Sequence, residues 1–362
     1  MKATIFRSVS EGYRIEDVQS LPPGPLDVVV KISASGVCGS DRHVLSGHLP
    51  LPTPLILGHE GCGVVESVGA GVRRVKVGDR VVTSADPACG TCWYCQRGQT
   101  TLCEIMGQVV MAPRAHLSDR GTAFAMVGLG TLAEYATVNE ASVIPVVSDL
   151  PDEQLALIGC GVTTGFGAVI RRARVEPGSR VAIIGCGGVG LAACQAASVA
   201  GATEIIAIDP VVMKLEAARR MGATATSSGD RLEVLGFIRD RTGGRGVDYA
   251  FEVVGKPATM TMAIEATRPG GTTVLVGYPA PGDVLELDVL AFCNGEKKLM
   301  STRFGSGDIR RDFQLIADLA GAGRLDLGAL VSKRVPLDDA SLQSAFAELD
   351  AGNVIRSVVI PG

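Results

Sequence analysis

Four cysteines fall within fifteen residues of the chain, in the run PACGTCWYCQRGQTTLC. They are Cys89, Cys92, Cys95 and Cys103, and their spacing is Cys-x2-Cys-x2-Cys-x7-Cys. A loop with this spacing can fold back so that four thiolates surround one Zn²⁺ at tetrahedral corners. Four sulfurs leave no open coordination position, so the pattern predicts a structural zinc. Two disulfides or four unrelated core cysteines are the alternatives.

The size and charge of the chain limit its class. A length of 362 residues favours two domains, each large enough for its own core. The net charge is -4 and the sequence has no basic block, which argues against nucleic acid or an anionic membrane as partner. We find neither an apolar stretch of membrane-spanning length nor a signal peptide at the N-terminus. We therefore expect a soluble cytoplasmic protein whose ten cysteines are thiols or metal ligands.

The texture of the sequence changes near residue 150. Before it, short β-branched runs at 27–33, 62–68 and 79–83 predict strands of an irregular, mostly antiparallel region. After it, apolar runs at 180–184, 204–208, 248–254 and 273–276 alternate with helical patterns, which predicts an α/β fold with a parallel sheet covered on both faces. The closing RSVVIPG would return a strand to the first domain.

A glycine fingerprint follows the first of these later strands. Gly185, Gly187 and Gly190 form Gly-x-Gly-x-x-Gly between an apolar strand and a helix, where the helix N-terminus would face a pyrophosphate. Asp209 ends the next strand, where a carboxylate binds the adenosine ribose and favours NAD over NADP. The alternatives are an ordinary glycine turn and a helix cap. Cys186, at a variable position of the loop, is expected to pack rather than react.

Three further ligand candidates are scattered along the chain: Cys38 in GVCGSDRH, His59 in LGHEG and Cys160 in IGCGVTTG. Two thiolates and one imidazole would leave a fourth position open, which is the pattern of a catalytic zinc. The spacing alone does not establish the trio, because a lone histidine is more often a satisfied polar group.

The segment GHEGCGVVESVGAGV, the four-cysteine loop, GCGVTTGFGA and VAIIGCGGVG occur in this order. Together they resemble the zinc-dependent medium-chain dehydrogenase/reductase family, specifically its zinc alcohol dehydrogenases. The resemblance implies two zinc ions per chain, a catalytic one on Cys38, His59 and Cys160 and the structural one on the cysteine loop. It also implies a GroES-like catalytic domain at 1–161 and 304–362, a Rossmann NAD-binding domain at 162–303, and an active site between them.

The same resemblance assigns further roles. It makes Glu60 an acid beside the metal, Asp41 the carboxylate that orients His59, and Ser40 and His43 a relay that carries the alcohol proton to solvent. The other expected cofactor contacts are Thr164, Gly188, Val189, Lys214, Val276 and Arg356. For Asp41 and Glu60 simple loop capping is the alternative, and surface or packing roles are the alternatives for Thr164, Val189, Lys214 and Arg356.

The resemblance implies direct hydride transfer between NAD and a primary or secondary alcohol. Small Ala85 suggests a pocket for an alcohol larger than ethanol, aryl or medium-chain. A long insertion between Cys103 and Glu134 favours a homodimer over a tetramer. The alternatives are a thiol-adduct formaldehyde dehydrogenase, which would need basic residues such as Arg42, Arg114 or Arg120, a carbonyl reductase, and a non-catalytic member of the family.

Overall fold

The computed structural model describes residues 1–119 and 121–362 and divides into two compact units. Unit 1 comprises Met1–Cys160, Asp308–Gly323 and Leu327–Gly362, and unit 2 comprises Gly161–Gly307 and Arg324–Asp326. The chain therefore changes unit after Cys160 and after Gly307, and it returns to unit 2 for the three residues Arg324–Asp326. The sequence interpretation placed boundaries after residues 161 and 303.

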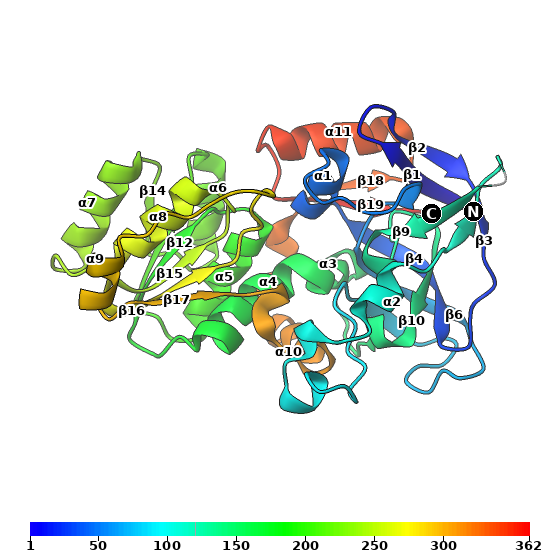
Figure 1. The fold of residues 1–362 in the computed structure, drawn as a ribbon, viewed down its shortest axis with the longest axis horizontal. Helices are drawn as coiled ribbons and strands as arrows, with labels where there is room; N and C mark the ends of the chain where they lie inside the picture. Colours follow the sequence, from blue (N-terminus) through cyan, green and yellow to red (C-terminus); the bar gives the residue numbers. More distant parts are fainter. Residues whose placement is uncertain (120) are drawn as a thin grey trace. The chain divides into compact units, whose positions relative to one another are not determined.

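Unit 1 is built mainly from strands (Figure 1). One group of strands follows the order β2-β1-β5-β9-β8-β3 and comprises β1 (Lys2–Ser8), β2 (Gly12–Asp17), β3 (Gln19–Ser20), β5 (Leu55–Ile56), β8 (Ala115–His116) and β9 (Thr122–Ala125). A second follows the order β11-β7-β6-β4-β19-β18, with β10 also on β4, and comprises β4 (Asp27–Gly36), β6 (Glu60–Val68), β7 (Arg80–Thr83), β10 (Tyr135–Asn139), β11 (Val143–Pro145), β18 (Val331–Pro336) and β19 (Arg356–Ile360).

The second sheet joins the C-terminal strand to an early strand of the chain. In β4 the side chains of Val28, Val30 and Ile32 alternate toward one core, as a half-buried strand requires. The C-terminal strand β19 pairs antiparallel with β4, so the closing RSVVIPG does return to the first unit.

Short helices complete unit 1: α1 (Gly39–Leu45), α2 (Met106–Val110), α3 (Asp152–Leu157), α10 (Ile309–Gly321) and α11 (Asp339–Asp350). Leu342 and Phe346 of α11 pack into a core that also holds Leu55, Leu57 and Val359. After α3 the backbone continues as a π-helical stretch, Ile158–Val162, which carries Cys160.

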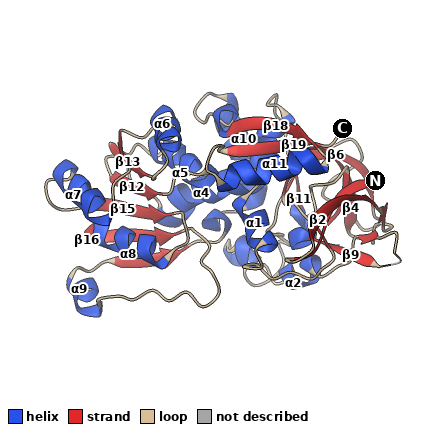
Figure 2. Cartoon of the chain, turned by 90° about the horizontal axis from the view of Figure 1, so that it is seen from above, coloured by secondary structure: helices blue, strands red, loops and turns tan. Residues whose placement is uncertain are grey.

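Unit 2 is a parallel sheet in the order β14-β13-β12-β15-β16-β17 (Figure 2). Its strands are β12 (Arg180–Ile184), β13 (Glu204–Ile208), β14 (Ala225–Ser227), β15 (Val247–Glu252), β16 (Thr267–Leu275) and β17 (Lys298–Ser301). Its helices are α4 (Thr163–Gly167), α5 (Gly188–Val199), α6 (Val212–Arg220), α7 (Arg231–Arg241), α8 (Pro257–Ala266) and α9 (Val289–Asn294).

Helices cover both faces of this sheet. Ala182 and Ile184 of β12 join a core with Ile238 of α7 and Ala263 of α8. Between them Ile183 points the other way, toward Gly190 at the start of α5. Near-continuous apolar strands are what such a doubly covered parallel sheet requires, and the predicted α/β fold class is confirmed.

One helical run needs a correction to the sequence interpretation. Within the described residues, Asp152–Ala173 is long and apolar enough to cross a membrane by length and composition, with a mean hydropathy of 1.3. The sequence reading recognised no stretch of that length because glycines and threonines interrupt it. However, 72% of its most apolar window is buried inside the protein, as in a core helix.

Candidate metal centres and nucleotide site

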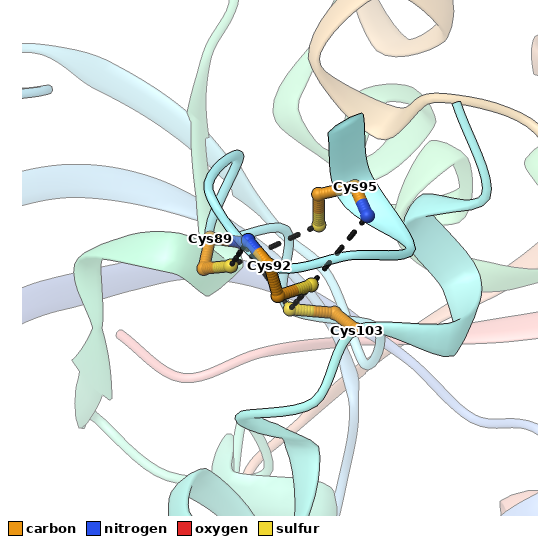
Figure 3. Close-up of side chains that lie close together, drawn as sticks. All are labelled: Cys89, Cys92, Cys95 and Cys103. Carbon is orange, nitrogen blue, oxygen red and sulfur yellow. Dashed lines mark hydrogen bonds between the residues drawn. The ribbon is translucent and has the colours of Figure 1, made fainter. Parts of the chain in front are cut away.

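The four loop cysteines point their sulfurs toward a common space (Figure 3). All four Sγ atoms lie within 4.8 Å of one another, and the Cys89–Cys95 and Cys92–Cys103 sulfur pairs are each 3.9 Å apart. These separations are far beyond a disulfide bond, and none of the ten cysteines, all of which lie in the described residues, forms a disulfide. The disulfide alternative therefore does not describe this loop.

Backbone N–H groups stabilise thiolates in the loop. Thr91 and Cys92 donate to Cys89 Sγ at 3.4 and 3.3 Å, and Cys95 donates to Cys92 Sγ at 3.5 Å. At Cys89 burial opposes ionisation, but the Thr91 and Cys92 donors outweigh it and lower the pKa to about 6, whereas burial raises the pKa of Cys95. Converging sulfurs that already receive N–H donors fit a tetrahedral zinc.

The loop also carries the single tryptophan of the chain. Trp93 lies between two of the cysteines and is 53% exposed. The guanidinium carbon of Arg97 stands 4.0 Å from the Trp93 ring centroid, and the Tyr94 ring meets it edge-on at 5.0 Å. These contacts order the outer surface of the loop.

A second cluster forms entirely within unit 1. Ligand atoms of Cys38, His59, Glu60 and Cys160 all lie within 4.8 Å of one another. Cys38 follows β4, His59 precedes β6, and Cys160 comes from the π-helical stretch. The structure thus brings the scattered trio together and adds Glu60 to it.

A tight turn delivers His59 to this cluster. Gly58 has a φ of +92°, and an added Cβ would stand 2.4 Å from the backbone nitrogen of Leu132. A residue with a side chain would therefore be strained here and would collide with the neighbouring strand connection.

His59 supplies the test of whether a metal fits. Its side chain is 3% exposed, and neither ring nitrogen makes a hydrogen bond among the described residues. Nδ1 stands 3.5 Å from Asp41 Oδ1. A buried imidazole without a hydrogen-bond partner, beside two thiols, fits a metal ligand whose other nitrogen faces a carboxylate.

Asp41 holds the two ligand segments to each other. Its carboxylate accepts hydrogen bonds from the N–H of Cys38 at 2.9 Å and of Gly58 at 3.1 Å. The residue therefore caps α1, as the alternative reading required, and also faces His59, as the resemblance implied.

Arg356 lies against this cluster. Its side chain is buried, and Nη2 stands 3.7 Å from both Cys38 Sγ and Glu60 Oε1. The neighbouring Cys160 thiol lowers the pKa of Cys38, and the charges of Arg356 and His59 act in the same direction. Burial raises the pKa of Glu60 to about 8, and Cys38 adds to this rise. Sequence reasoning selected Arg356 only for a pyrophosphate contact, which stays a prediction.

The glycine loop of unit 2 has the local geometry of its fingerprint. Gly185 has a φ of +98°, and a Cβ at Gly190 would stand 1.8 Å from Gly185 O. Nothing lies within 4 Å of a Cβ built at Gly187, so a ligand can approach the backbone there. Gly188 begins α5, Val189 is half-buried on its first turn, and Cys186 is fully buried as packing requires.

Asp209 joins this loop to the following helix. Its Oδ2 accepts from Cys186 N at 2.8 Å, and its Oδ1 accepts from Val211 N at 2.9 Å. Each carboxylate oxygen has a second acceptor position, so these bonds leave capacity for ribose hydroxyls.

The remaining predicted residues divide between the units. In unit 1, Ser40 and His43 lie on α1, with Ser40 Oγ 3.9 Å from Cys38 Sγ. His43 is half-buried, its ring centroid 6.0 Å from that of His48, and burial followed by His48 lowers its pKa. In unit 2, half-buried Thr164 lies on α4, Lys214 on α6, and Val276 directly after β16.

Two of the three basic residues considered for a thiol carboxylate, Arg42 and Arg114, already have acidic partners. Arg114 is 6% exposed and pairs with Asp27 at 2.9 Å, and Arg42 pairs with Asp350. Arg120 lies outside the described residues.

Comparison with known proteins places this geometry in a family. Residues 24–151 match the family model described as an alcohol dehydrogenase GroES-like domain, and residues 188–320 match the model described as a zinc-binding dehydrogenase. A Mycobacterium tuberculosis protein named "Putative alcohol dehydrogenase D" is 36% identical over 369 residues, which cover 99% of each chain.

Two solved structures extend the likeness to the fold. Benzyl alcohol dehydrogenase from Acinetobacter calcoaceticus superposes with a TM-score of 0.91 at 28% identity, covering 100% of this chain and 99% of the other. A zinc-binding dehydrogenase from Sinorhizobium meliloti, bound to NADP, gives 0.80 at 29% identity and covers 99% of each chain. The chain therefore belongs to the zinc-dependent medium-chain dehydrogenase/reductase family, among its zinc-containing alcohol dehydrogenases.

Proposed function

We propose that this protein is a zinc-dependent, NAD-linked alcohol dehydrogenase that interconverts an alcohol and its aldehyde or ketone by direct hydride transfer. The observation that carries the proposal is that Cys38 and Cys160 lie beside the buried imidazole of His59, for which the described residues supply no hydrogen-bond partner. Two sulfurs and one nitrogen leave a coordination position for substrate oxygen, whereas the four-sulfur loop leaves none.

When bound, the zinc supplies a Lewis acid that stabilises the alkoxide form of the alcohol. Cys38, His59 and Cys160 would hold it, and Asp41 fixes the orientation of the imidazole. Ser40 Oγ accepts the alcohol proton, which reaches solvent through His43. The lowered pKa of His43 keeps its imidazole neutral, and therefore able to accept that proton, down to a lower pH. Gly185, Gly187 and Gly190 cradle the pyrophosphate, and Asp209 binds the adenosine ribose.

The proposed substrate is a primary or secondary alcohol larger than ethanol, of aryl or medium chain length. The size of this alcohol is proposed from the small side chain of Ala85, which is half-buried and packs against the core of the second sheet. The structural similarity to a benzyl alcohol dehydrogenase supports the aryl choice.

Other features complete the proposal. Asp209 favours NAD, although a relative at 29% identity was solved with NADP. A cytoplasmic location accords with ten free thiols. Two features support a homodimer. Among the described strands β17 is at the edge of the parallel sheet, where a strand of a second copy can pair, and Val289 and Leu290 on the preceding α9 are exposed.

A thiol-adduct formaldehyde dehydrogenase is the alternative activity. It is less well supported because Arg42 and Arg114 are committed to Asp350 and Asp27. Formaldehyde turnover that requires glutathione or mycothiol would favour it.

The test is a zinc count together with NAD⁺ and NADP⁺ reduction over benzyl alcohol, hexanol, secondary alcohols and thiol adducts of formaldehyde. We expect two zinc ions per chain and NAD⁺ reduction with benzyl alcohol or hexanol. A fully zinc-loaded protein that reduces neither coenzyme with any of these alcohols would contradict the proposal.

A further inference from the structure

Gly36, the last residue of β4, lies directly opposite Glu60 in the antiparallel pairing of β4 with β6. It is buried, and its φ lies outside the left-handed region. The backbone conformation therefore does not explain why a glycine stands here.

The space above Gly36 is filled by the Glu60 side chain. A Cβ added to Gly36 would stand 2.1 Å from Glu60 Oε2, 3.1 Å from Glu60 Cβ and 3.0 Å from Leu157 Cδ2. The other carboxyl oxygen, Oε1, stands 3.7 Å from Arg356 Nη2. The carboxyl group is thus seated between the bare Cα of Gly36 and the Arg356 guanidinium.

The backbone of Glu60 is fixed on both sides, so it cannot absorb a collision. On one side Gly58 packs against Leu132, where a Cβ would have no room. On the other, Gly61 N donates to Thr83 Oγ1 at 3.1 Å, and this hydroxyl donates back to Gly61 O at 3.3 Å. A side chain at residue 36 must therefore move the Glu60 carboxyl group.

We propose that Gly36 is a positioning residue, whose missing side chain provides the resting place of the Glu60 carboxyl group beside the metal ligands. A Glu60 carboxyl oxygen already lies within 4.8 Å of the ligand atoms of Cys38, His59 and Cys160. Displaced from Gly36, the carboxylate competes with substrate oxygen for the open coordination position. The inference rests on the proposed zinc at this cluster.

The experiment is a double-mutant cycle of Gly36→Ala and Glu60→Ala, with Gly321→Ala as the matched control. Gly321 ends α10, and a Cβ there meets nothing within 4 Å. Three quantities are measured: kcat, the rate of zinc release to a chelating dye, and the melting temperature of the zinc-free protein. The release phase of the Cys38 cluster is identified as the one missing from His59→Ala.

We expect Gly36→Ala to lower kcat about tenfold, because the displaced Glu60 carboxylate would disturb the geometry near the reacting atoms. We also expect slower zinc release from this cluster, because Glu60 would act as a fourth ligand. In the Glu60→Ala background the same change should alter kcat less than about twofold, since the collision is gone. Gly321→Ala should match the wild type. Should Gly36→Ala fail to fold while the double variant folds, that rescue supports the inference directly.

Equal losses of kcat and of melting temperature in both backgrounds would overturn the inference, because packing against Leu157 would then explain them. Failure of both Gly36→Ala variants to fold would overturn it as well. The zinc content of the wild type separates this inference from the function it rests on. A wild-type chain that binds zinc only in the four-cysteine loop removes the proposed function and the inference together, whereas two zinc ions with an additive cycle remove the inference alone.

Discussion

Asp41 shows how a single side chain can set a ligand geometry. Its two oxygens accept from the N–H groups of Cys38 and Gly58 and stand beside His59 Nδ1, so it fixes two loops and one ring at once. The sequence could indicate this residue, because it lies three positions after Cys38. It could not indicate the contact of Arg356 with Cys38, which joins residues 318 positions apart and follows no local pattern.

At this scale the first prediction concerns His59. His59→Ala should remove one of two zinc ions and lower kcat by more than about a hundredfold, since even the outer partners of ligands contribute 10- to 100-fold. NAD binding should persist, because the glycine loop lies in the other unit. Metal analysis, steady-state kinetics and NADH titration check this. His116→Ala, at an exposed position of β8, is the control, and unchanged turnover in His59→Ala would refute the assignment.

The second concerns Asp209. Asp209→Ala should raise the NADP-to-NAD ratio of kcat/KM about tenfold, equivalent to about 1.4 kcal/mol, because a negative charge no longer repels the 2′-phosphate. Asp209→Asn separates charge from structure, since it keeps an oxygen that accepts from Cys186 N or Val211 N. An unchanged coenzyme ratio in both variants would show that Asp209 only braces the loop.

At the scale of elements, hydrophobic periodicity predicted the strands well where burial of apolar side chains alone determines the pattern. The alternation of Val28, Val30 and Ile32 marks β4, and the continuous apolar runs mark β12 and β13. The π-helical stretch around Cys160 could not be predicted, because its register depends on packing with the rest of unit 1 rather than on a residue pattern. The close contact of Gly36 with the Glu60 side chain could not be predicted either, because it also depends on tertiary packing.

The four-cysteine loop gives a prediction about stability. Cys92→Ala should release one zinc and destabilise the protein by about 3 kcal/mol, because loss of a metal ligand is among the few single changes with effects this large. Thermal unfolding with zinc analysis measures both, and Cys293→Ala, an exposed cysteine, is the matched control. A zinc-depleted Cys92→Ala protein of normal stability would contradict a structural role.

Asp248 links three strands of unit 2 and gives a pH prediction. Its carboxylate accepts from Arg180 N at 2.7 Å and from Arg268 Nε at 2.6 Å. Burial opposes ionisation, but these donors prevail and lower the pKa of Asp248. A lowered folded-state pKa stabilises the folded protein at pH values above the unfolded-state pKa of about 3.9. This contribution is lost as the pH falls through the folded-state pKa.

Asp248→Asn should therefore be less stable than the wild type at pH 7, and the difference should shrink as the pH falls below about 4. Urea unfolding across this range measures it. Asp240→Asn, at an exposed position of α7, should show neither effect. A difference that is constant with pH would mean that the charge contributes nothing.

At the scale of the whole molecule, the order of motifs was enough to predict the α/β architecture and the two side-chain clusters that the structure brings together, because each motif fixes a local structure that the family combines in one way. Oligomeric state belongs to this scale too. We expect a dimer by light scattering, and Val289→Asp with Leu290→Asp should yield monomers, since charges oppose burial of these 65% and 71% exposed side chains. A dimer that persists in the double variant would place the interface elsewhere.

Trp93 makes the four-cysteine loop report on its own state. Since the chain has no other indole, its intrinsic tryptophan emission arises at the loop alone, between Cys92 and Cys95 and beneath the Arg97 guanidinium. Removing metal from that loop should shift the emission of Trp93, whereas removing metal from the cluster of Cys38, His59 and Cys160 should leave this emission unchanged. Tryptophan fluorescence of the unlabelled protein would thus show which of the two clusters has lost its metal.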